Sequence, residues 1–230
     1  MVMPRTCVVC GTTLLAGEDS ICTECLSDMP YTRFWTMSHN RMADKFNERL
    51  IGVASRYEYA AALLYYDDGS LYRLVPQAIK YGRRFDCGRL FGTMLGQRIS
   101  GTELFTDVDM VVPVPLHWTR RWKRGYNQAE VIAAAVAAEL GVPVCGRALV
   151  RKRRTRTQTR LGIDGKAVNV SGAFGVNPSF ASKLKCCRHI IILDDVFTTG
   201  STVAECCRAL RSICSSATRI SAVTLSFVDN

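Results

Sequence analysis

Two adjacent acids followed by small hydroxyl residues form the stretch of this sequence with the clearest capacity for chemistry. The stretch is HIIILDDVFTTGST, residues 189–202, in which Asp194 and Asp195 follow four apolar residues. An apolar run of this length predicts a buried strand, and the residues from 201 onward predict a helix. The carboxylates would then lie at a strand end and the hydroxyls at a helix start, where open parallel sheets bind their ligands.

A helix start is suited to a phosphate group. Its first backbone N–H groups lack partners within the helix and carry partial positive charge, and Gly200 lets the backbone approach a ligand closely. The hydroxyls that could add hydrogen bonds belong to Thr198, Thr199, Ser201 and Thr202. The two carboxylates suit vicinal hydroxyls, as on a ribose, or a hydrated Mg²⁺. Together these groups describe a ribose 5-phosphate, whereas a plain strand joined to a capped helix would leave the adjacent acids unexplained.

Four cysteines near the start of the chain predict a metal site. They are Cys7, Cys10, Cys22 and Cys25. Each Cys-x2-Cys pair can point two thiolates at a centre about 2.3 Å away, which is typical of a structural zinc site. Four sulfurs leave no position for water, so we expect no catalysis by the metal. Residues 26–86 contain no cysteine, so one zinc is predicted; cysteines that only pack or form redox pairs are the alternative.

The positive charge is concentrated in two segments. Of the 30 basic residues, four lie in RRWKR, residues 120–124, and seven in residues 147–160, with no acid in either segment. The remaining 19 basic residues face 20 acids, so the net charge of +10 comes from these segments. Such runs indicate an anionic partner, with solubilising loops as the alternative. Trp118, Trp122 and Tyr126 interleave with the first run, a composition typical of surfaces that stack on bases.

The elements that must position these residues alternate between strand and helix. We expect strands at 109–115, 168–176, 189–193 and 219–228, helices at 127–143 and 201–214, and loops at 116–126 and 194–200. This alternation predicts an α/β fold with a mainly parallel sheet. Residues 31–106 carry mixed signals. The predicted division is a cysteine lobe at 1–30, a linker or hood region at 31–106 and the main domain at 107–230.

Composition and cysteine usage favour a cytoplasmic protein without membrane insertion. No apolar stretch approaches the about 18 residues that span a bilayer, and the start MVMPRTCVVCG holds no apolar core of a secretory signal. Eleven cysteines, with adjacent pairs at 186–187 and 206–207, are poorly suited to disulfides. We therefore expect mostly free thiols in a reducing compartment.

Several motifs in order resemble a known family. IIILDDVFTTGST is similar to the phosphoribosyl pyrophosphate (PRPP) binding motif of type I phosphoribosyltransferases. The cysteine lobe, VVPVPLHWTRRWKRGYNQAE, RTQTRL and NVSGAF together resemble the ComF family, relatives of the amidophosphoribosyltransferases. The resemblance implies a type I phosphoribosyltransferase fold with a small zinc lobe.

The resemblance also implies roles for individual residues. Asp194 and Asp195 would be the catalytic residues at the ribose hydroxyls, residues 198–202 would hold the 5-phosphate, and Mg²⁺ would accompany PRPP. The loop from Pro115 to Gln128 would lie by the pyrophosphate, and the basic run 151–160 would form a flexible loop over the site. The residues assigned to these two loops are His117, Arg120, Arg121, Arg124, Asn127, Gln128, Arg154, Arg156 and Gln158.

Two functions follow, and the sequence leaves both open. The first is an enzyme that transfers the phosphoribosyl group to an amine or base, or hydrolyses PRPP. The second is a factor that binds single-stranded DNA in association with a DNA-uptake machinery, because ComF relatives are linked to uptake of transforming DNA. The acceptor and the oligomeric state are not readable from the residues.

Overall fold

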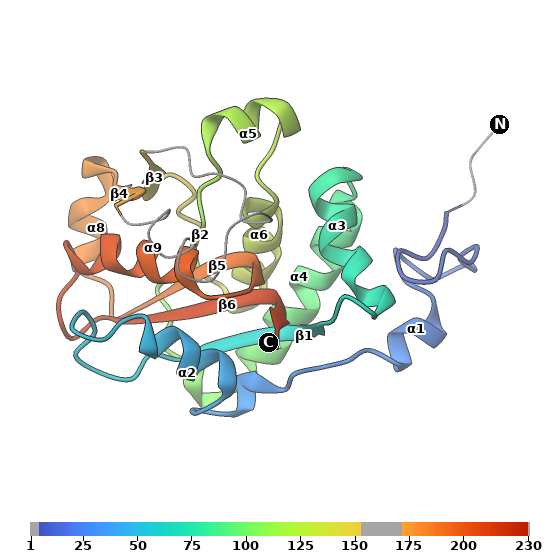
Figure 1. The fold of residues 1–230 in the computed structure, drawn as a ribbon, viewed down its shortest axis with the longest axis horizontal. Helices are drawn as coiled ribbons and strands as arrows, with labels where there is room; N and C mark the ends of the chain where they lie inside the picture. The colour runs from blue at the N-terminus through green and yellow to red at the C-terminus, as the bar shows by residue number, and fades with distance from the viewer. Residues whose placement is uncertain (1–4, 153–171, 230) are drawn as a thin grey trace.

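One parallel sheet of four strands carries the candidate site (Figure 1). This computed structural model describes residues 5–152 and 172–229. The strands, in the spatial order β1-β6-β5-β2, are β1 (Ala60–Tyr66), β6 (Arg219–Val228), β5 (His189–Phe197) and β2 (Met110–Pro113). All three neighbouring pairs are parallel, so the expected α/β fold with a mainly parallel sheet is confirmed. A separate antiparallel ribbon joins β3 (Leu149–Arg151) to β4 (Phe174–Val176).

Helices cover both faces of the sheet (Figure 1). One face packs against α4 (Phe85–Ser100) and α6 (Gln128–Leu140), and the other against α2 (Arg41–Glu48) and α9 (Ser201–Arg211). The remaining α-helices in the described part of the chain are α1 (Thr23–Ser27), α3 (Leu74–Tyr81), α5 (Trp118–Arg124) and α8 (Ala181–Lys185), and short 3-10 helices lie at Phe34–Thr36, Leu71–Arg73, Glu103–Phe105 and Pro178–Phe180. Residues 190–193 of β5 are fully buried, as expected for a central parallel strand that is apolar on both faces.

Glycines on α4 allow it to pack closely against α6. A methyl group added at Gly92 would lie 2.8 Å from Cβ of Ala135 and 2.9 Å from the carbonyl oxygen of Ile132. At Gly96 it would lie 2.7 Å from Cβ of Glu139. The helix that follows the basic segment, α6, is thus packed against both α4 and the sheet.

Several predicted elements are confirmed near their expected ends. The 127–143 helix is α6, in which the Asn127 side chain accepts a hydrogen bond from the Ala129 N–H and Gly141, at φ +66°, ends the helix. The predicted strands at 109–115 and 219–228 are β2 and β6. Of the predicted 168–176 strand, the described portion contains β4.

Two expectations about loops are wrong. The strand of residues 189–193 continues to Phe197, because β6 offers main-chain partners along its whole length and pairs Asp194 with Thr224 and Phe197 with Phe227. Residues 118–124 form α5, since the His117 side chain caps its start and Gly125, at φ +82°, ends it.

The segment 31–106 contributes directly to the core. It supplies β1, which pairs with β6, and both α3 and α4. The division of the chain at residues 30 and 106 remains a prediction. Among the described residues, no helix is long and apolar enough to cross a bilayer.

Candidate functional site

The two carboxylates lie in the second half of β5, toward the carboxyl end of the sheet. Asp195 is buried and Asp194 is half-buried, and Oδ1 of Asp194 accepts a 2.9 Å hydrogen bond from the Asp195 N–H. Val114 also approaches this end, because its N–H donates to the Leu193 carbonyl at 2.8 Å. The loop after β2 and the end of β5 therefore lie side by side.

Burial and mutual repulsion shape the electrostatics of the pair. Burial, followed by the nearby charge of Asp195, raises the pKa of Asp194 to about 7. Nζ of Lys80, at the end of α3, lies 2.9 Å from Oδ2 of Asp195. Burial alone would lower the pKa of Lys80, but attraction to the two carboxylates outweighs it and raises that pKa. The site thus holds one ammonium against two acids, of which one takes up a proton near neutral pH.

The hydroxyl residues form a tight turn at the start of α9. Gly200 adopts φ +72°, and a methyl group there would lie 2.5 Å from the Phe197 ring. Hydroxyls of Thr199 and Ser201 are 3.0 Å apart, and Thr198 is exposed. The first N–H groups of this 11-residue helix have no acceptor within the helix, so the turn offers several donors to an anion.

Basic side chains surround the approach to α9. Nε of Arg49 donates to the Thr199 carbonyl at 3.0 Å, and Arg208 donates to the Arg49 carbonyl. A hollow of about 740 Å³ opens beside α9 and reaches Ser201; its charged lining residues are Arg49, Lys152, Arg208 and Glu205. Glu205 pairs with Arg208, which leaves the hollow with an excess of positive charge.

The residues predicted for the pyrophosphate loop have mixed environments. Buried Asn127 donates to the Val114 carbonyl at 3.0 Å, and buried His117 accepts from the Thr119 N–H at 3.3 Å, so both hold the local backbone. Gln128 is buried and accepts from Arg124 at 2.6 Å. Nη1 of Arg121 lies 3.1 Å from Oε1 of Glu130, with the Arg121 side chain 57% exposed.

The other predicted loop residues cannot be placed. Arg154, Arg156 and Gln158 lie outside the described residues, as does the side chain of Arg120. The described members of the loop lie between the end of β2 and the start of α6.

A segment that sequence reasoning left without a role lies against this loop. The Tyr126 hydroxyl donates to the Ile79 carbonyl, and the Phe85 ring meets the Tyr126 ring edge-on with centroids 4.7 Å apart. The guanidinium of Arg124 lies 5.1 Å from the centre of the Tyr81 ring. This segment carries a basic cluster of its own, IKYGRR at residues 79–84, which is the pattern that could have pointed to it, whereas nothing in the sequence points to Arg49.

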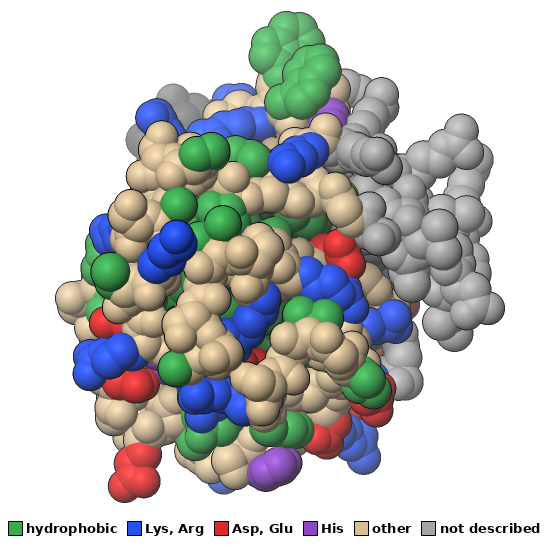
Figure 2. All heavy atoms as spheres, turned by 90° about the vertical axis from the view of Figure 1, so that its left-hand side faces the viewer, with side chains coloured by type: hydrophobic (Ala, Val, Ile, Leu, Met, Phe, Trp, Pro, Cys, Tyr) green, Lys and Arg blue, Asp and Glu red, His purple; other side chains and the backbone are tan. Residues whose placement is uncertain are grey.

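Exposed aromatic rings lie on α5 and at the end of α3. Trp118 is 72% exposed, Trp122 86% and Tyr81 75%. Figure 2 shows hydrophobic side chains projecting from the top of the molecule, the end that α5 occupies in Figure 1, with basic side chains below them. Exposed rings of this size beside cations indicate a binding surface rather than core.

The four cysteines meet in the N-terminal lobe. Their sulfur atoms all lie within 4.8 Å of one another, and Sγ of Cys10 is 3.7 Å from Sγ of Cys22. Sulfurs on a zinc tetrahedron with 2.3 Å bonds are about 3.8 Å apart. Backbone N–H groups of Val9 and Cys22 donate to Sγ of Cys7 at 3.4 Å and orient this sulfur. The cluster is compatible with a structural zinc.

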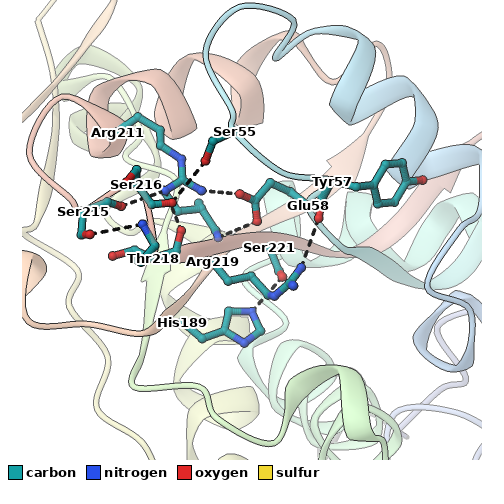
Figure 3. Close-up of polar contacts among 12 residues, drawn as sticks. Ser55, Tyr57, Glu58, His189, Arg211, Ser215, Ser216, Thr218, Arg219 and Ser221 are labelled. Carbon is teal, nitrogen blue, oxygen red and sulfur yellow. Dashed lines mark hydrogen bonds and ion pairs between the residues drawn. The ribbon is translucent and has the colours of Figure 1, made fainter.

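The opposite end of the sheet holds a second set of buried charges (Figure 3). Fully buried Glu58 pairs with Arg211 and accepts from the Ile220 N–H at 2.9 Å. Both ring nitrogens of His189 have partners, Asp107 at 3.0 Å and Ser221 at 2.8 Å. Burial lowers the pKa of His189 to about 4. These partners lie within the protein, so the network is structural.

The chain is similar in sequence to bacterial proteins named for competence and DNA utilization. Competence protein F of Haemophilus influenzae is 32% identical over 105 residues, which are 46% of this chain and 45% of that protein. DNA utilization protein YhgH of Salmonella typhi is 30% identical over 208 residues, 89% of this chain and 77% of that protein. YhgH of Escherichia coli O157:H7 is 28% identical over 229 residues, 91% of this chain and 92% of that protein.

No protein-family model matches the chain. Among solved structures, orotate phosphoribosyltransferase from Aeropyrum pernix is 16% identical, with a TM-score of 0.32 over 80% of this chain and 81% of that chain. The alignment with competence protein F spans less than half of that protein, but the alignment with YhgH spans most of both chains. From these relatives and the four-cysteine lobe, the chain belongs to the ComF family of competence protein F and YhgH.

Proposed function

We propose that this chain binds PRPP with Mg²⁺ at the carboxyl end of β5 and transfers its phosphoribosyl group with release of pyrophosphate. One observation carries the proposal: two adjacent carboxylates at the end of a central strand are followed within seven residues by a hydroxyl-lined helix start. The two groups suit the two ends of a ribose 5-phosphate.

The roles follow from the chemistry of each group. Asp194 and Asp195 accept hydrogen bonds from the ribose hydroxyls, and the turn 198–202 donates to the 5-phosphate. The buried, ion-paired Oδ2 of Asp195 and the half-buried Asp194 form an oxygen donor set that fits a hydrated Mg²⁺. When bound with PRPP, Mg²⁺ supplies neutralising charge for the pyrophosphate.

The transfer needs positioning and charge neutralisation more than proton abstraction. As the acceptor forms a bond to C1 of the ribose, the bond from C1 to the pyrophosphate oxygen breaks and both electrons leave with the pyrophosphate. The proton that an amine or water acceptor loses passes to solvent water. We assign the guanidinium groups for the growing charge on the pyrophosphate to Arg121 and Arg124, in the loop predicted to lie by the pyrophosphate, and to the run 151–160. An amine or a base is the acceptor class, with water as the acceptor in hydrolysis.

The test is calorimetric titration with PRPP and Mg²⁺, followed by pyrophosphate release. Asp194→Asn with Asp195→Asn is expected to weaken binding by about a hundredfold or more, since two charge-assisted contacts are lost. The chain offers a matched control, because Asp67 and Asp68 are also adjacent and follow parallel strand β1, but are exposed. Asp67→Asn with Asp68→Asn should bind normally. Equal binding by wild type and the 194/195 variant would refute the proposed site.

A second candidate function is single-stranded nucleic-acid binding. The observation that favours it is the meeting of two acid-free segments, 79–85 and 117–128, with exposed Tyr81, Trp118 and Trp122 among their cations. The names of the relatives, DNA utilization protein and competence protein, point the same way. Bases would stack on the rings while guanidinium groups hold the phosphates.

Salt dependence tests this function. Affinity for a labelled oligonucleotide should fall by about 0.7 log units per log unit of salt for each phosphate neutralised. Trp118→Ala with Trp122→Ala should weaken binding by about tenfold to a hundredfold, as expected for loss of base stacking. Leu15→Ala is the control, since Leu15 is 71% exposed in the cysteine lobe. A flat salt response would reject this function.

We also propose that the cysteine lobe holds one zinc with a purely structural role. Three hydrogen bonds between residues far apart in the sequence join the described part of the lobe to the main body: Ser20 to Asp86 at 2.7 Å, Tyr72 to the Cys25 carbonyl at 2.6 Å, and the Tyr65 N–H to the Pro30 carbonyl at 2.9 Å. Metal analysis should find about one zinc per chain. Chelation should speed proteolysis within residues 5–30 and leave PRPP binding intact. None of the eleven cysteines, all of which lie in the described residues, forms a disulfide, which supports the proposed location in a reducing cytoplasm.

A further inference from the structure

Lys80 contacts the carboxylate that the proposed function assigns to the ribose. Its Nζ lies 2.9 Å from Oδ2 of Asp195, and its side chain is 24% exposed while that of Asp195 is 6% exposed. Within the described chain, Oδ2 of Asp195 accepts no hydrogen bond of good geometry. The ammonium is therefore the charge that balances this buried oxygen, and it remains within reach of solvent.

The backbone around Lys80 is fixed to the predicted pyrophosphate loop. The Tyr126 hydroxyl donates to the carbonyl of Ile79, and Nη2 of Arg83 donates to the carbonyl of Arg124 at 3.4 Å. The end of α3 is thus joined to the segment between α5 and α6. Lys80 lies where the carboxylate pair and that loop meet.

We propose that Lys80 is the resident counter-ion of Asp194 and Asp195, and that it excludes a free divalent cation from them while admitting Mg²⁺ in complex with PRPP. The identity of the ligand rests on the proposed function. A free Mg²⁺ would lie beside an ammonium in a partly desolvated place, where like charges repel strongly.

Lys80 attracts the complex of Mg²⁺ with PRPP, because this complex carries net negative charge. An ammonium has three N–H donors, so Lys80 can keep one on Asp195 and turn the others to phosphate oxygens. The mobile four-carbon stem of lysine permits this adjustment, and its compact charge attracts the anion. The same cation that repels the bare metal therefore favours the loaded ligand.

The test is binding of Mn²⁺ alone to the protein, measured by the electron paramagnetic resonance signal of the ion. The measurement is made at about pH 8, where carboxylates are ordinarily ionised. Lys80→Gln and Lys80→Met should each bind Mn²⁺ at least about tenfold more tightly than wild type, the size expected for loss of one charged contact. Lys80→Arg keeps the cation and should behave as wild type, as should Lys185→Met, which removes an exposed lysine of α8. Adding Asp195→Asn to Lys80→Gln should abolish the gain. A folded Lys80→Gln protein with wild-type Mn²⁺ affinity would overturn the proposal.

Titration with PRPP and Mg²⁺ separates this inference from the proposed function. Lys80→Gln should bind the complex about tenfold more weakly than wild type. If wild type binds no PRPP, the proposed function fails. The Mn²⁺ result still decides whether Lys80 excludes a free divalent cation from the two carboxylates. A Lys80→Gln protein that binds the complex as tightly as wild type would contradict the second half of the proposal.

Discussion

The two ends of the central sheet hold similar charged groups and use them differently. At the amino ends of β5 and β6, Glu58 is fully buried and its oxygens are matched by Arg211 and a backbone N–H. At the carboxyl end of β5, Asp195 faces the ammonium of Lys80, and the neighbouring hydroxyl turn is half-exposed. The partners of Glu58 are all buried within the protein, whereas the partner of Asp195 is a lysine that is 24% exposed, next to the half-buried Asp194, so a ligand can reach the charges at the carboxyl end only.

The largest effect is expected at the amino end. Arg211→Met leaves Glu58 buried without its guanidinium, and burial already raises the pKa of Glu58. Breaking such a pair costs about 3–5 kcal/mol of unfolding free energy. Urea denaturation measures this loss. Arg188→Met is the control, because the Arg188 side chain is 73% exposed and its removal should cost under about 0.5 kcal/mol. A loss below 1 kcal/mol for Arg211→Met would remove the contrast between the two ends.

The carboxyl end should gain stability as pH falls. The pKa of Asp194 is about 7 in the folded protein, above its ordinary value, so the folded state takes up a proton between about pH 8 and 5 while the unfolded chain does not. Stability from this group is present at low pH and lost as pH rises through 7. Asp194→Asn should remove the slope and stabilise the protein at about pH 8 by on the order of 2 kcal/mol. Denaturation curves across this range in both proteins provide the measurement.

The amino end should respond to pH with the opposite sign. Burial lowers the pKa of His189 to about 4. As pH falls from about 7 to 4, this histidine is therefore protonated in the unfolded chain before it is protonated in the folded protein. This group therefore costs stability at acid pH, by on the order of 2 kcal/mol. His189→Gln should flatten that slope, even though it loses contacts with Asp107 or Ser221. Equal slopes in His189→Gln and wild type would show that His189 is not the group responsible.

The smallest effect on stability is expected at the exposed rings. Trp118 and Trp122 are 72% and 86% exposed, so Trp118→Ala with Trp122→Ala should change the unfolding free energy by no more than about 0.5 kcal/mol. Buried Phe91, replaced by alanine, should by contrast cost about 3–5 kcal/mol. Thermal unfolding of both variants makes the comparison. A large loss from the tryptophan pair would mean that these rings support the fold instead of forming a surface for binding.

Local patterns predicted much of the fold because local chemistry decides those elements. The Asn127 side chain caps the start of α6, and the backbone of Gly141 ends the helix. The apolar run 190–193 is stable only when it is buried inside the sheet. The extension of β5 to Phe197 was missed, because its hydrogen bonds come from β6, about thirty residues further along the chain. The cap on α5 was also missed, since a histidine is a rare N-cap.

The sequence by itself determined which chemical groups the candidate site offers: four thiolates at zinc spacing, two adjacent carboxylates and a hydroxyl turn with Gly200. The four cysteines lie within residues 7–25, and the carboxylates and the hydroxyl turn within residues 194–202, so spacing along the chain brings each set together. The tertiary structure decided which distant residues complete them. Lys80 reaches Asp195 from more than a hundred positions away, and Arg49 reaches the turn at Thr199 from α2. Such pairings depend on how helices pack across the sheet, and side-chain packing is a property of the whole chain, which no short stretch encodes.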